Sequence, residues 1–284
     1  MSETIQLPQG PIRYRDSGGG GEAIVFVHGY LVDGRLWERA AEALAPEFRC
    51  VVADWPMGAH AEPMNADADL SPPGMARIIA GFLEALDLDR VTIAGNDSGG
   101  AISQVLVTSH PERIGRLVLT NCDTQEHFPP PPFGLLTSIA RVPGAMAAMG
   151  LALRIGAVRR ATFAPFSKHA IPDELSASWM APGAGDPRIR RDLRKFTVGI
   201  DKRHTIEAAR RLASFSSPTL FAWAPEDRFF KLDHAERLAE IIPDARIVEI
   251  PDAKTFVALD QPERLAEAIA AFMRETAAVL AVEP

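Results

Sequence analysis

Short apolar runs alternate with segments of helical periodicity over the first 123 residues of the chain. Four runs rich in Val, Ile and Leu are predicted as buried strands, over residues 23–29, 49–55, 90–96 and 115–121. Between them, apolar residues recur at helical spacing over residues 34–44, 72–86 and 100–110. Continuous apolar strands that alternate with helices indicate a mostly parallel central sheet flanked by helices on both faces.

This alternation stops after residue 123 and returns at residue 217. The region from 124 to 216 is interrupted by prolines and contains no strand-like run, but it has several helical stretches. From residue 217 a strand, a helix, a second strand and a last helix follow in order. We therefore predict an α/β core from residues 1–123 and 217–284, with a helical cap inserted over residues 124–216.

Composition and charge narrow the class of protein. The chain has 284 residues, of which 47% are hydrophobic and 24% charged, and a net charge of −7, which describes an ordinary globular protein and argues against nucleic acid as a partner. No apolar run approaches the roughly 18 residues that span a bilayer, so no membrane partner is expected. Both cysteines, Cys50 and Cys122, lie beside predicted buried strands, which favours free thiols over a disulfide.

The remaining expectations about location and partners follow from the same composition. The N-terminus has no signal-peptide pattern, so a cytoplasmic location is expected. Neither a cofactor nor a metal is predicted. A small molecule is the expected partner, and a homo-oligomer is left open.

The stretch VTIAGNDSGG, Val91 to Gly100, places two nucleophilic side chains next to each other. A nucleophile elbow is a strained strand-to-helix turn with a glycine two residues before and two residues after the nucleophile. Asp97 has both, Gly95 and Gly99, whereas Ser98 would have Asn96 in the first position. The alternative is an ordinary turn in which Asp97 caps the next helix. The glycine spacing makes Asp97 the predicted nucleophile.

Two further stretches match the surroundings that such a nucleophile needs. The strand ending at His28 is followed by a glycine, and backbone N–H groups at this turn could form an anion hole with the N–H of Ser98. A later strand runs into Asp227, where the acid of a catalytic triad would stand. Chain order therefore agrees for the nucleophile and the acid.

These motifs resemble the α/β-hydrolase superfamily over essentially the whole chain, with the helical insertion in the place of its cap domain. The combination is most similar to the branch with an aspartate nucleophile, the haloalkane dehalogenases and epoxide hydrolases. The resemblance implies that Asp97 attacks carbon to form an ester and that N–H groups near Tyr30 and Ser98 hold the oxyanion or halide. It also implies that Asp227 orients a histidine, which activates the water that hydrolyses the ester.

This sequence differs from the residue pattern of that family at three points. The usual position of the histidine holds Thr255, which cannot act as a base near neutral pH, and Lys254 precedes it. Ser98 replaces the aromatic residue that dehalogenases of this type carry after the nucleophile. The only tyrosines, Tyr14 and Tyr30, lie outside the insertion that supplies the tyrosine pair of epoxide hydrolases. Without a positioned base, hydrolysis of an ester on Asp97 should fall by roughly 10²–10⁴-fold.

Other residues could supply acid–base chemistry or line the pocket. His127 leaves the sheet at the predicted catalytic edge and is the best alternative base, with His60 as a weaker one. Asp123 follows a strand at the same edge, where one carboxylate of a close pair could stay protonated as an acid while the other serves as a base. His28 and Trp179 are expected to line the substrate pocket.

The sequence thus leaves three functions open. The leading hypothesis is a hydrolase with an incomplete triad that acts on a small, largely apolar alkyl halide, epoxide or ester through Asp97. The second is a lyase or isomerase in which Asp97 moves a proton. The third is a binding or sensor protein that has kept the pocket and lost the chemistry.

Overall fold

Strands form a single mixed sheet in the computed structural model, which describes residues 2–131 and 133–282. Over this part of the chain eight strands lie in the order β1-β2-β4-β3-β5-β6-β7-β8, and all pairs from β4 to β8 are parallel. The strands are β1 (Ser2–Leu7), β2 (Gly10–Asp16), β3 (Ala23–Val27), β4 (Arg49–Ala53), β5 (Val91–Asp97), β6 (Ile114–Cys122), β7 (Thr219–Trp223) and β8 (Ala245–Glu249). The prediction of a mostly parallel sheet flanked by helices is confirmed.

The first two strands are not predicted by the sequence pattern. β1 and β2 form an antiparallel hairpin, and β2 continues antiparallel to β4. Only one face of this pair packs on the core, through residues such as Ile12 and Tyr14, while Arg13 between them is exposed. Half-buried edge strands lack the continuous apolar runs that reveal the central strands.

Side chains on the two faces of the sheet enter two separate parts of the core. Ile24 and Phe26 point to one face and Val25 and Val27 to the other, as expected for the two-residue period of a strand. The face of Val25 is covered by α2 (Pro72–Ala85), α3 (Ser98–Ser109), α9 (Lys202–Leu212) and α10 (Leu232–Ala239). The opposite face is covered by η1 (Gly34–Trp37), α1 (Glu38–Leu44), α11 (Val257–Asp260) and α12 (Pro262–Val282).

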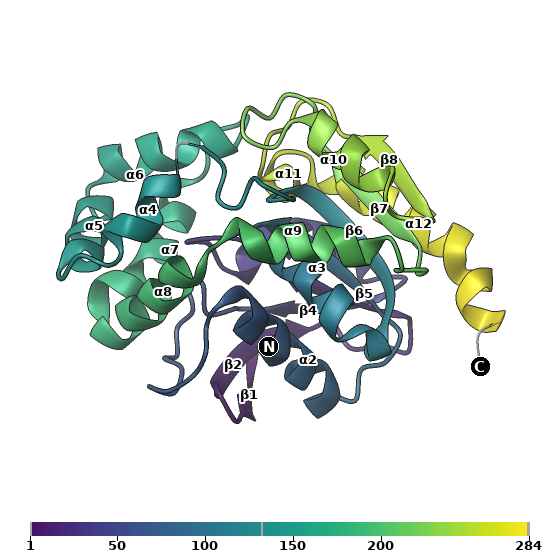
Figure 1. Cartoon of the computed structure of the whole chain (residues 1–284), viewed down its shortest axis with the longest axis horizontal. Helices are drawn as coiled ribbons and strands as arrows, with labels where there is room; N and C mark the ends of the chain where they lie inside the picture. The colour runs from purple at the N-terminus through teal and green to yellow at the C-terminus, as the bar shows by residue number, and fades with distance from the viewer. Residues whose placement is uncertain (1, 132, 283–284) are drawn as a thin grey trace.

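Helices alone fill the chain between β6 and β7, as the sequence predicts. They are α4 (Gly134–Ile139), α5 (Ala145–Leu153), α6 (Gly156–Phe163), η3 (Ala164–Phe166), α7 (Asp173–Gly185), α8 (Pro187–Gly199) and α9. Figure 1 shows α4 to α8 gathered at the left of the sheet, whereas α9 crosses the core next to α3. The boundaries of a cap domain at residues 124 and 216 stay a prediction, with α9 packed on the core side.

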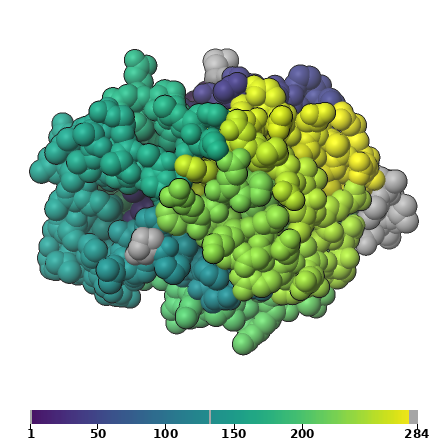
Figure 2. Space-filling view, turned by 90° about the horizontal axis from the view of Figure 1, so that it is seen from above, coloured from purple at the N-terminus to yellow at the C-terminus, as the bar shows by residue number. Residues whose placement is uncertain are grey.

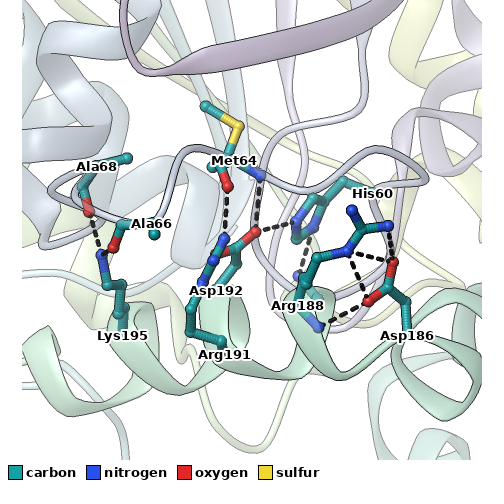
Figure 3. Close-up of polar contacts among 10 residues, drawn as sticks. His60, Met64, Ala66, Ala68, Asp186, Arg188, Arg191, Asp192 and Lys195 are labelled. Atoms are coloured by element: carbon teal, nitrogen blue, oxygen red, sulfur yellow. Dashed lines mark hydrogen bonds and ion pairs between the residues drawn. The ribbon is translucent and has the colours of Figure 1, made fainter.

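Polar contacts fasten α8 to the loop that follows β4 (Figure 3). The buried Asp192 carboxylate accepts the Met64 N–H at 2.8 Å and lies 3.4 Å from His60 Nε2. Lys195 Nζ donates to two carbonyl oxygens of the same loop, at Ala66 and Ala68, over 2.6 and 2.7 Å. Buried charged hydrogen bonds are costly to break, so this contact holds the helical insertion to the core.

Two expectations from the composition concern the cysteines and membrane insertion. Cys50 and Cys122 are both buried free thiols, which confirms that prediction. Among the helices of residues 2–131 and 133–282, none has the length and apolar character to cross a bilayer.

Candidate functional site

Asp97 occupies a strained turn between β5 and α3. Its backbone has φ 52° and ψ −133°, a conformation that non-glycine residues rarely adopt and that is typical of a nucleophile elbow. The flanking Gly99 is required by space, because a Cβ there would lie 2.2 Å from the carbonyl oxygen of His28. The Asp97 side chain makes no hydrogen bond that caps α3. The turn therefore has the elbow geometry, and the helix-cap alternative is wrong.

One oxygen of the Asp97 carboxylate is held by the loop after β3. The Tyr30 N–H donates to Asp97 Oδ2 at 2.8 Å. Gly29 makes this approach possible, since a Cβ at that position would lie 2.1 Å from the same oxygen. The N–H group predicted to form the anion hole thus binds the carboxylate of the elbow residue itself.

The environment of Asp97 weakens its acidity. Burial raises the pKa of Asp97 to about 6, and the nearby Asp227 carboxylate adds to the rise. Hydrogen bonds from the Tyr30 and Ser98 N–H groups oppose it by stabilising the anion. Near neutral pH the carboxylate is therefore mostly ionised and close to its titration point, which suits a nucleophile or a base.

Asp123 supplies a second carboxyl group at the same site. It follows β6, which pairs with β5 so that Cys122 lies opposite Asp97. Asp123 is buried, and its Oδ1 makes no hydrogen bond with any residue that the structure describes. Burial and the Asp97 charge raise the pKa of Asp123 well above its ordinary value. The charge of Asp97 therefore disfavours ionisation of Asp123.

Asp227 and Thr255 form a separate hydrogen-bonded pair. The Thr255 hydroxyl donates to Asp227 Oδ2 at 2.7 Å, while the N–H groups of Phe229 and Phe230 donate to Oδ1 at 2.8 and 3.2 Å. Burial raises the pKa of Asp227, and these hydrogen bonds limit the rise. The threonine hydroxyl therefore binds the acid that would orient a triad histidine.

Two asparagines fix this arrangement, and neither role was predicted from the sequence. Asn96 donates to the carbonyl oxygen of Thr255 at 2.6 Å and to the Thr120 hydroxyl at 2.8 Å. Asn121 bonds the backbone at both ends of the Asp227 loop, accepting from Ala224 N–H and donating to the Phe230 carbonyl. Their positions at the ends of two neighbouring parallel strands were the available signal.

An apolar cavity of about 310 Å³ opens onto the two carboxyl groups. Asp97, Ser98, Asp123 and Tyr30 provide most of its polar lining, and no Lys, Arg or His of residues 2–131 and 133–282 lines it. The other walls are mostly apolar side chains. They come from the helical region around α4, α5, α6 and η3 and from two core loops, among them Phe133, Leu136, Met149, Leu153, Val158, Phe163, Phe166, Phe230 and Phe256. Figure 2 shows a hollow between teal segments of the helical insertion, with purple N-terminal atoms visible inside it.

Two residues expected in the pocket do not line it, and those predictions are wrong. Trp179 is fully buried, and its indole N–H donates to Asp33 Oδ1 at 3.1 Å, as a buried indole requires. His28 is also fully buried, and its Nε2 accepts the Trp55 N–H at 2.8 Å. Burial lowers the pKa of His28. Both side chains hold loops in place beneath the cavity.

The alternative bases suggested by the sequence lie elsewhere. His127 stacks on His234 with ring centroids 4.1 Å apart, beside a separate surface hollow, and does not line the main cavity. The side chain of His60 pairs with Asp192 of α8 (Figure 3). Asp123, by contrast, does lie in the cavity. Among the described residues, no group of three or more His, Cys, Asp or Glu side chains is placed to hold a metal ion.

Comparison with known proteins identifies the family. A family model described as alpha/beta hydrolase fold matches residues 22–262, and the chain belongs to this family. It is 28% identical over 263 residues to a 2-hydroxy-6-oxononadienedioate/2-hydroxy-6-oxononatrienedioate hydrolase from Paraburkholderia xenovorans, covering 87% of this chain and 86% of that protein. It is also 28% identical over 274 residues to haloalkane dehalogenase 2 from Mycobacterium bovis, covering 94% and 93%.

A solved structure supports the same fold. An alpha/beta hydrolase fold protein from Burkholderia ambifaria superposes with a TM-score of 0.80 at 21% identity, covering 95% of this chain and 97% of that one. The relatives of this chain thus include proteins named as hydrolases and as dehalogenases.

Proposed function

We propose that this protein is an enzyme that acts on a small, largely apolar substrate through the carboxylate of Asp97, as nucleophile or as base. The observation that carries the proposal is the placement of Asp97: a strained turn presents it to an apolar cavity, and the Tyr30 N–H fixes one oxygen at 2.8 Å. A carboxylate fixed in this way is oriented before substrate binds, which is a main source of catalytic rate.

As a nucleophile, Asp97 would displace a leaving group from carbon. A new bond forms between a carboxylate oxygen and the substrate carbon, the bond from that carbon to a halogen or epoxide oxygen breaks, and an ester remains on the enzyme. Asp123 lines the same cavity, and in this mechanism it would donate its proton to an epoxide oxygen as the ring opens.

Release of such an ester is the step this site supports poorly. Hydrolysis needs a base beside the ester, and the cavity lining described contains no histidine. We propose that Thr255 stands where the triad histidine would be, because its hydroxyl occupies Asp227 Oδ2. An ester on Asp97 should therefore accumulate.

Exposure of the protein to alkyl halides and to epoxides, followed by intact-mass and peptide mass spectrometry, tests the nucleophile. The expected result is a stable mass increase on the peptide that contains Asp97, and none in Asp97→Asn. Unmodified Asp97 with every electrophile that is shown to enter the cavity would contradict the nucleophilic role and would leave proton transfer or ligand binding.

Proton transfer is a second function that a specific observation favours. Asp97 and Asp123 line one cavity and the pKa of each is raised, and in such a pair one carboxyl group can serve as a base while the other serves as an acid. Such a pair can remove a proton at one carbon and return one at another, as a lyase or isomerase does. Loss of substrate-derived deuterium to water that requires Asp97 but produces no adduct would support this function.

The acidic substrate in the name of one relative does not fit this cavity. A dienedioate carries two carboxylates, and the lining described offers two carboxyl groups and no cation. Like charges in an apolar cavity repel strongly. The proposed substrate is therefore not a dicarboxylate.

A further inference from the structure

One long stretch of the helical insertion contains no acidic residue. From His127 to Pro172 the sequence has five cationic side chains, namely Arg141, Arg154, Arg159, Arg160 and Lys168, and neither Asp nor Glu. The whole chain has a net charge of −7. A basic segment in an acidic protein produces a local positive field that attracts anions.

Large apolar side chains are exposed in the same stretch. Of the eight exposed large hydrophobic residues found in the described chain, six lie here, namely Leu135 (71% exposed), Ile139 (46%), Val142 (56%), Leu151 (65%), Ile155 (59%) and Val158 (39%). They come from α4, α5, α6 and the turns between these helices. Exposed apolar residues that gather on one part of a surface mark an interaction site. We refer to these six residues as the apolar rim.

The apolar rim is continuous with the mouth of the active-site cavity. Val158 belongs to both, since it is exposed at the surface and also lines the cavity. Leu136 and Thr137, which lie between two rim residues, line the cavity as well. In Figure 2 the teal segments that carry the rim surround the hollow. A surface that binds the apolar rim would therefore also face the entrance of the cavity.

The five cations of this stretch differ in whether they form ion pairs. Arg159 and Arg160 share Asp173, and Lys168 pairs with Glu226. Arg141 and Arg154 are exposed and form no ion pair with any residue in 2–131 or 133–282. Arg141 follows α4 and Arg154 follows α5, so each lies next to rim residues.

Contrary to the expectation of no membrane partner, we propose that the apolar rim docks on the surface of an anionic lipid membrane. Entry of apolar substrates to Asp97 from the bilayer would follow, and this part rests on the proposed function. Apolar side chains with Arg beside them are the pattern of segments that lie in a membrane interface without crossing it. A second copy of the chain is the other occupant of such a surface. In a two-fold dimer the same patch meets itself, so Arg141 and Arg154 would face their own copies without an acid in the stretch to pair with.

Flotation of the full chain with vesicles tests this proposal. Vesicles of phosphatidylcholine with phosphatidylglycerol should bind the protein, and salt should weaken the binding. Leu151→Glu with Ile155→Glu should reduce binding at least tenfold, because both side chains are exposed and make the rim polar. Arg141→Gln with Arg154→Gln should lower the preference for anionic over pure phosphatidylcholine vesicles about fivefold per arginine.

Ile247→Glu with Val248→Glu is the matched control, since these are the two exposed large hydrophobic residues found outside the rim among the described side chains, in β8. This variant should bind vesicles as the natural protein does, and circular dichroism checks that each variant is folded. Equal vesicle binding by the Leu151/Ile155 variant and the natural protein would overturn the proposal. So would failure to bind vesicles together with a dimer, seen by analytical ultracentrifugation, that the Leu151/Ile155 variant abolishes.

Discussion

Replacing Thr255 by Val should destabilise the protein in a manner that depends on pH. Valine keeps the shape of threonine but cannot donate the 2.7 Å hydrogen bond to Asp227 Oδ2. Asp227 is 4% exposed, so water does not readily replace the lost donor. A hydrogen bond to a charged group contributes about 1.5–3 kcal/mol, which corresponds to a loss of about 3–12 °C in Tm at 2–4 °C per kcal/mol.

The pH dependence follows from the pKa of Asp227. Its folded pKa is raised above the ordinary value, and the Thr255 hydroxyl limits that rise. A raised folded pKa in an acid favours folding at low pH, and this contribution is lost as the pH rises through the folded pKa. Loss of the hydroxyl raises the folded pKa further. The destabilisation by Thr255→Val should therefore be larger at pH 8 than at pH 5.

Thr92→Val provides the matched control within the same protein. Thr92 is a fully buried residue of β5, and its hydroxyl makes no hydrogen bond with any described residue. Valine in a strand at this position should leave the stability unchanged or raise it. Thermal unfolding followed by circular dichroism at the two pH values measures both variants. If the free energies of unfolding of the two variants agree within about 0.5 kcal/mol at pH 8, the bond to Asp227 has no energetic role and the reasoning is refuted.

Three further predictions concern Asp97. The rate of alkylation of Asp97 should rise about tenfold per pH unit below pH 6 and level off above pH 6, because only the ionised carboxylate attacks and its pKa is about 6. A rate of alkylation that does not depend on pH would contradict this. Thr255→His should speed loss of the ester adduct by roughly 10²–10⁴-fold in a mass-spectrometric time course. Gly29→Ala should abolish adduct formation, because a Cβ there would lie 2.1 Å from Asp97 Oδ2, whereas Gly81→Ala in α2 has open space and should retain it.

The local spacing of residues was enough to predict the central strands and the elbow. Gly95, Asp97 and Gly99 lie within five positions, and their conformation is set by the turn they form, so the sequence alone could indicate a strained nucleophile. Continuous apolar runs likewise mark strands that are buried on both faces. The N-terminal hairpin was not predicted because only one of its faces is buried.

Residues whose partners lie far along the chain could not be placed in this way. Trp179 bonds to Asp33 across 146 positions, and His28 bonds to the Trp55 N–H, so tertiary packing decides that both are buried supports. The position of Asp123 near Asp97 was predicted from the strand ends, whereas the lack of a hydrogen bond to its Oδ1 among the described residues was not. No local pattern encodes these contacts.

The hydrogen bond from Tyr30 to Asp97 restricts the kind of carbon on which the site can act. In enzymes that cleave esters or amides, backbone N–H groups polarise the carbonyl oxygen of the substrate and stabilise the tetrahedral species that follows. Here that donor already serves an oxygen of the protein at 2.8 Å. If Asp97 acts as proposed, the site suits displacement at saturated carbon or removal of hydrogen from carbon, and an acyl group that enters the cavity would find the Tyr30 N–H already bound to Asp97.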